Sequence, residues 1–92
     1  MPTLKSGMLA YVDSYSGLVP CKVLAIEAAQ YGGHIAYVRY TAQRGLYKRG
    51  ETGKHNACHV VPRDAVRRFR GQFWPRILPY SVLPDAQGSV NA

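Results

Sequence analysis

Acidic residues are scarce in this chain: five of its 92 residues are aspartate or glutamate, against twelve lysines and arginines. No two of the five are neighbours in the sequence, so the pattern offers no carboxylate pair for general acid–base catalysis. The serines and cysteines also lack the local setting of a catalytic nucleophile. We therefore expect a binding protein that is not an enzyme.

Cysteine is scarce too, and Cys21 and Cys58 lie far apart. Such spacing favours a small buried side chain and reduced thiols over a disulfide. Zinc is the competing interpretation, because His55, Cys58 and His59 are close in sequence. Zinc motifs, however, repeat short spacings such as Cys-x-x-Cys, which are missing here. We expect no metal and no cofactor.

Long apolar runs are absent: none approaches the about 18 residues that a membrane-spanning helix needs. The first residues carry one lysine and no apolar run of signal-peptide length. Gly45 and Gly50 have P-loop spacing, but Glu51-Thr52 follows where Lys-Ser/Thr is required, so the lysine that binds the phosphates is missing. The sequence therefore predicts a cytoplasmic or particle-associated protein that is neither secreted nor membrane-bound.

Positive charge is concentrated in the second half, where only Glu51 and Asp64 oppose it between Arg39 and Arg76. Uncompensated charge of one sign attracts polyanions. The residues expected to meet nucleic acid or an acidic partner are Arg44, Lys48, Arg49, Lys54, Arg67, Arg68 and Arg70.

Most of the chain has the alternation of β-strands. His34–Thr41 predicts a central strand that pairs on both sides, with Ala36, Val38 and Tyr40 in the core and Arg39 toward solvent. The other predicted strands are Met8–Val12, Leu18–Ala28 and Ala57–Val61. Within the second, apolar Cys21–Ile26 suggests a strand covered on both faces, although good helix formers over Ala25–Gln30 leave a helix open. Gly50–Asn56 is predicted to be a loop.

The C-terminal third changes character. Val66, Phe69 and Phe73 follow one helical stripe, which predicts a short helix over residues 64–73. Beyond it, prolines separate large apolar residues, so an extended arm should pack on its own domain or on a partner. The arm residues expected to bind a partner are Trp74, Ile77, Leu78, Tyr80 and Leu83. This divides the chain into a lead-in (1–6), a β-domain (7–73) and a Pro-rich arm (74–92).

Together, Gly7–Val12, Pro20–Val23, Ala36–Tyr40 and Val60–Pro62 resemble the strands of an SH3-like small barrel, of the Tudor, KOW and chromo type. The resemblance covers residues 7–66. It implies a mainly β fold, to which the short helix and the extended arm are added. Such barrels bind proline-rich peptides, methylated side chains or nucleic acid, but no binding residue carries over. Residues that could form an aromatic cage are Tyr11, Tyr15, Tyr37, Tyr40 and Tyr47, and core packing is their favoured role.

Two functions fit these features. The first is a structural or assembly module that docks onto a larger complex, such as a viral particle or a ribonucleoprotein, through its arm and basic face. Its partner is then another protein or further copies of itself. The alternative is a nucleic-acid-binding barrel that contacts phosphates through Arg44–Lys54 and Arg67–Arg70. The apolar arm favours assembly, and the excess positive charge favours nucleic acid.

Overall fold

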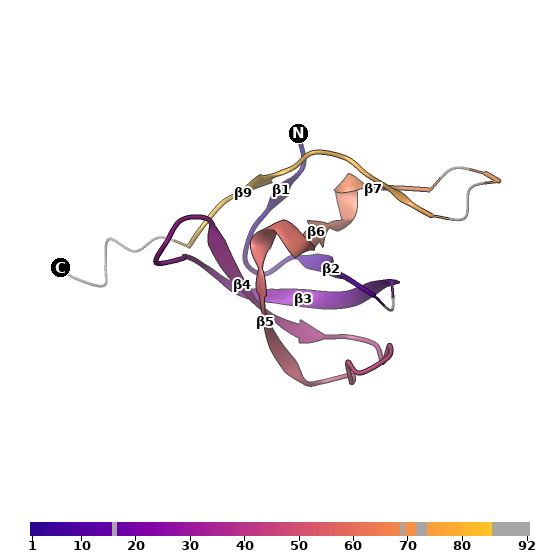
Figure 1. Ribbon diagram of the computed structural model, residues 1–92, viewed down its shortest axis with the longest axis horizontal. Coiled ribbons are helices and arrows are strands. Elements are labelled where there is room, and N and C mark those ends of the chain that lie inside the picture. Colours follow the sequence, from indigo (N-terminus) through magenta and orange to yellow (C-terminus); the bar gives the residue numbers. More distant parts are fainter. Residues whose placement is uncertain (16, 69, 72–73, 86–92) are drawn as a thin grey trace.

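The computed structural model describes residues 1–15, 17–68, 70–71 and 74–85. Its body is an antiparallel sheet in the order β5-β4-β3-β2-β6 (Figure 1). The strands are β2 (Leu9–Ser14), β3 (Gly17–Ala28), β4 (His34–Tyr40), β5 (Thr52–Asn56) and β6 (Val60–Pro62). β6, the last strand of this sheet along the chain, therefore pairs with β2, the first. The predicted mainly β class is confirmed.

Shorter elements surround this sheet. The 3₁₀ turn η1 (Ala57–His59) joins β5 to β6, and η2 (Arg63–Ala65) follows β6. β1 (Thr3–Leu4) pairs in parallel with β9 (Ser81–Val82), and β7 (Val66–Arg67) pairs antiparallel with β8 (Arg76–Ile77). In Figure 1 the chain from β8 to β9 runs along the upper side of the molecule, over the sheet.

The predicted phase of the strand at 34–41 is confirmed. Ala36, Val38 and Tyr40 are buried, Arg39 is exposed, and β4 pairs with both β3 and β5. The strand that pairs with β4 on its C-terminal side was not predicted, because β5 lies in Gly50–Asn56, the segment predicted to be a loop. The strand predicted over Ala57–Val61 begins instead as the turn η1 and becomes extended only at Val60.

The helix predicted over residues 64–73 is wrong for the described part of that segment. Its first residues belong to η2, and Val66–Arg67 pairs with Arg76–Ile77. The amide of Leu78 also donates to the carbonyl of Ala65 at 2.8 Å. Short helices are marginal in water, and here the returning arm supplies backbone partners that a helix would exclude. Phe69 and Phe73 lie outside the described residues.

The prediction that β3 is covered on both faces is also wrong. Cys21 and Val23 are buried, whereas Lys22 and Leu24 are exposed. A register shift between Val23 and Ala25 adds a bulge at Leu24. One face of the sheet is therefore open to solvent.

The arm packs on its own domain, one of the two arrangements the sequence predicts. The hydroxyl of Tyr80 donates to the carbonyl of Ala57 at 2.9 Å, and Tyr80 and Val82 pack against the core. Further along, Asp85 and Ile26 exchange two hydrogen bonds, of 2.9 Å to the Ile26 carbonyl and 3.1 Å from the Ile26 amide. Leu4 of β1, in the predicted lead-in, is fully buried.

Candidate functional site

Two of the predicted basic residues meet at the tip of the β2–β3 hairpin. A pocket of about 330 Å³ is lined by Arg44, from the β4–β5 connection, and by Arg68, which follows β7. The hairpin supplies Asp13 and Ser14, and the arm supplies Trp74. Three segments distant in sequence thus place two guanidinium groups and an indole around one hollow.

Local chemistry fixes the hairpin that carries this pocket. Ser14 pairs with Gly17 across the turn, and the Ser14 hydroxyl donates to the Gly17 carbonyl at 2.8 Å. Gly17 has a φ of +98°, which glycine adopts without a steric penalty. The tight turn leaves Tyr15 fully exposed at the tip.

A second pocket, of about 540 Å³, adjoins the first because Asp13 and Ser14 line both. Its other lining residues include Tyr15, Tyr47 and His55. We call the two pockets together the hairpin groove; its described lining residues are Val12, Asp13, Ser14, Tyr15, Gly17, Leu18, Arg44, Tyr47, His55, His59, Arg68, Trp74, Pro75 and Ile77. Cations and aromatic rings thus line two adjoining pockets, a combination suited to phosphates and flat rings.

An aromatic cluster supports one wall of the groove. The ring centroids of Tyr40 and Tyr47 are 4.9 Å apart, and each lies 6.0 Å from that of His55. The Tyr40 hydroxyl lies 2.7 Å from Nε2 of His55. That hydroxyl fills the space that any side chain at position 53 would need, so Gly53 permits the contact. Tyr47 is therefore held in place by packing, as the interpretation of the tyrosines as packing residues implies.

Acidification should lower the stability of the fold through His55. Burial, with a smaller effect of His59, lowers the pKa of His55 in the folded chain. A lowered folded pKa means that the unfolded chain binds the proton better, so stability is present above the unfolded pKa and is lost as the pH falls. We expect the urea midpoint to begin to drop as the pH falls to the unfolded pKa of about 6.5, and to keep dropping below it. His55→Gln, which can still accept the Tyr40 hydroxyl, should flatten this dependence; an unchanged slope would contradict the assignment.

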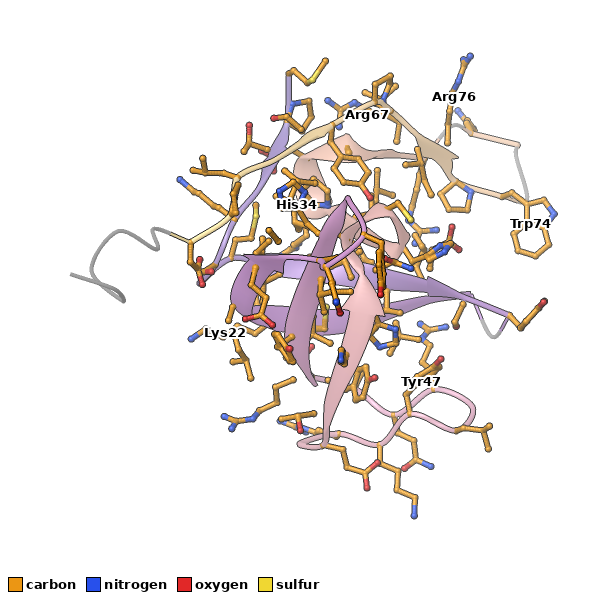
Figure 2. All side chains as sticks on the ribbon, turned by 60° about the vertical axis from the view of Figure 1, so that its left-hand side comes forward. Lys22, His34, Tyr47, Arg67, Trp74 and Arg76 are labelled. Atoms are coloured by element: carbon orange, nitrogen blue, oxygen red, sulfur yellow. The ribbon has the colours of Figure 1, made fainter. Side chains whose placement is uncertain are left out.

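Of the predicted site residues, only Arg44, Arg68, Trp74 and Ile77 are among the described lining residues of the groove. Lys48, Arg49 and Lys54 are exposed on the β4–β5 hairpin, and Arg70 is exposed after β7. The Arg67 guanidinium donates to the carbonyl of Asp64 at 2.5 Å, and Figure 2 places it far from Tyr47. Of the arm residues, Trp74, Ile77 and Leu83 are exposed, whereas Leu78 and Tyr80 are half-buried.

Sequence reasoning missed the part played by the hairpin tip and by two histidines. The residues from Asp13 to Gly17 predict a turn after the first strand, but they do not indicate which loops face that turn. His55 and His59 stood out only as weak zinc candidates, whereas both line the groove. Within the described residues, no group of three or more His, Cys, Asp or Glu side chains could hold a metal ion.

The two thiols are free and differ in accessibility. Burial raises the pKa of Cys21 to about 12, which keeps that thiol protonated, while Cys58 is exposed. The described part of the chain has no helix long and apolar enough to cross a membrane. No family model, curated protein or solved structure matches this chain.

Proposed function

We propose that this protein is a non-enzymatic nucleic-acid-binding module, built on an SH3-like barrel, and that the hairpin groove is its binding site. One observation carries the proposal: Arg44, Arg68 and Trp74 line the same pocket. Arg68 and Trp74 lie in the connection between β7 and β8, whereas Arg44 comes from the distant β4–β5 connection, so the fold brings the second guanidinium group to this pocket.

The groove suits a single strand better than a duplex. Arginine binds phosphate oxygens through its fork of N–H donors, and exposed rings stack on bases that a duplex would keep paired. Trp74 is 72 % exposed, and Tyr15 and Tyr47 offer further rings along the groove. Asp13, between the two pockets, would repel a phosphate but can accept a hydrogen bond from a base amino group.

The barrel assignment has its own support. In the sheet order, β6 returns to pair with β2, and the turn η1 separates β5 from β6. These features agree with the sequence resemblance over residues 7–66. The two ends of the strand order, β5 and β6, are joined by the single 3₁₀ turn η1.

A second function, docking onto a larger complex such as a viral particle or ribonucleoprotein, is favoured by the arm. Trp74, Ile77 and Leu83 expose apolar surface although the arm is tied to its own domain. Exposed apolar residues on an ordered segment favour contact with a protein. The two functions are compatible, since a module in a ribonucleoprotein or virion can hold nucleic acid and neighbouring chains together.

Arg44→Gln combined with Arg68→Gln should weaken binding of a single-stranded oligonucleotide. Each lost phosphate contact should reduce the slope of log affinity against log salt by about 0.7. Fluorescence anisotropy of a labelled oligonucleotide across a salt series measures this change. Trp74 is the only tryptophan, so quenching of its emission reports stacking in the same titration, and Trp74→Ala should cost about 1–3 kcal/mol.

The matched control is Lys48→Gln with Arg49→Gln, which removes the same charge outside the groove. It should lower affinity less than the groove pair and leave the quenching intact. Equal losses from both pairs would mean diffuse attraction to the net charge and no defined site. Binding absent even at low salt would exclude the nucleic-acid function and leave docking as the candidate.

A further inference from the structure

A band of positive charge crosses the open face of the sheet, away from the hairpin groove. Strand register aligns Thr52, Arg39, Lys22 and Leu9 in one cross-strand row. The next outward pair along β4 and β5 is Tyr37 with Lys54. Figure 2 shows Lys22 on the opposite side of the molecule from Trp74. We call this surface the outer-face band: Leu9, Lys22, Leu24, Arg39, Lys54 and Arg63.

The charges in this band oppose each other directly. Lys22 and Arg39 are cross-strand partners, and both side chains are exposed. Like charges placed opposite each other destabilise a sheet. No carboxylate stands in their row among the described residues. Glu27, farther along the same face, has its carboxylate bound by the Tyr37 hydroxyl at 2.7 Å.

Arg63 extends the band across the sheet. Ala10 pairs with Pro62, so Arg63 follows directly beside Leu9. Arg63 and Leu9 line one shallow hollow of about 220 Å³, together with Tyr11 and Thr41. Cations therefore border Leu9 on both sides, with Lys22 on β3 and Arg63 after β6.

Apolar surface is interleaved with these cations. Leu9 is 46 % exposed within the row, and the bulge leaves Leu24, two residues after Lys22, 40 % exposed. Interfaces between proteins combine apolar side chains with charges that match the partner. Cations separated by leucines therefore fit a surface that carries both carboxylates and apolar side chains.

We propose that the outer-face band docks an acidic segment of a partner protein, one with apolar residues between its carboxylates. A nucleic-acid strand fits this face less well. Glu27, farther along the same face, would repel a phosphate backbone running along the strands. Tyr37 is half-buried with its hydroxyl bonded to Glu27, so it offers no free ring for stacking. With nucleic acid in the hairpin groove, the module would link the two kinds of partner.

The test uses the full chain and a short peptide of Glu-Glu-Leu repeats as probe, followed by two-dimensional NMR of the backbone amides. Addition of the peptide should shift the amides of Lys22, Leu24 and Arg39, and leave those of Arg44 and Arg68 in place. Lys22→Gln with Arg39→Gln should weaken peptide binding about tenfold, because two charges facing the partner are lost. The same variant should melt higher than the parent, since the opposed charges are gone.

Lys5→Gln with Arg76→Gln removes equal charge elsewhere and should change peptide affinity little. A peptide with serine in place of leucine should bind more weakly than the parent peptide at the same salt. The proposal is overturned if the peptide shifts no outer-face amide, or if both double variants lose affinity equally. It is also overturned if a single-stranded oligonucleotide shifts these amides and the peptide does not, which would make the band a nucleic-acid contact. Loss of groove binding in the oligonucleotide experiment leaves this result unaffected.

Discussion

Val38→Asp should abolish the fold. Val38 is fully buried in β4, between Val23 on one neighbouring strand and Gly53 on the other. A carboxylate there would lose its hydration without gaining a partner, at a cost of several kcal/mol. Stabilities of single domains are about 5–15 kcal/mol, and a chain this short falls toward the lower end. The variant should lack a cooperative thermal transition by circular dichroism.

The neighbouring residue provides the control. Arg39→Asp introduces the same side chain one position along the same strand, but on the exposed face. It should remain folded, and its Tm should change by only a few degrees because exposed substitutions are usually within about 0.5 kcal/mol. If Val38→Asp melts like the parent, the side chain does not face the core and the phase of the sheet is wrong.

This contrast marks what alternation alone can predict. The residue types at Ala36, Val38 and Arg39 specify both the strand and its buried face, because a slip of one residue would bury an arginine. The same logic failed for β3. Leu24 looks like a core residue by composition, but a bulge and the open face of the sheet leave it in solvent. Whether a second layer covers a strand is a tertiary property that composition does not encode.

The C-terminal part shows a different limit. Local periodicity favoured a helix after Asp64, yet Val66–Arg67 finds its partner in Arg76–Ile77. β5, with two polar residues and a glycine around Lys54 and His55, has weak strand propensity and forms because β4 supplies a ladder edge. In both segments, pairing with a consecutive strand of the chain decided the structure, against the local propensity of the residues.

The sequence predicted which residues of the candidate site could bind a partner, but not that they lie together. Sequence singled out Arg44, Arg68 and Trp74, but assigned the arginines to a basic face and the tryptophan to a partner-binding arm. The structure brings all three to one pocket. Neither Lys22 nor Arg39 was predicted as a binding residue, because their opposition depends on the register between β3 and β4.

Removing residues 80–92 should destabilise the domain by about 4 kcal/mol or more, since it uncovers Leu4 and deletes the packed side chains of Tyr80 and Val82. It also removes the hydrogen bonds that join Ser81 to Pro2, Leu83 to Leu4 and Asp85 to Ile26. The division of the sequence at residue 74 makes the opposite prediction, a β-domain that folds without its arm. Urea unfolding of the two chains separates these outcomes.

One shorter truncation and one point variant show which arm residues stabilise the domain. A chain ending at Asp85 keeps every arm contact named above, so a loss of stability that it does not share with the chain ending at Pro79 belongs to residues 80–85. Tyr80→Phe removes only the hydroxyl that donates to Ala57, and should cost about 1 kcal/mol because the carbonyl then lacks that partner. If the chain ending at Pro79 unfolds at the same urea concentration as the full chain, the arm does not stabilise the domain. Its apolar residues are then available to another protein, and docking becomes the better account of why they are there.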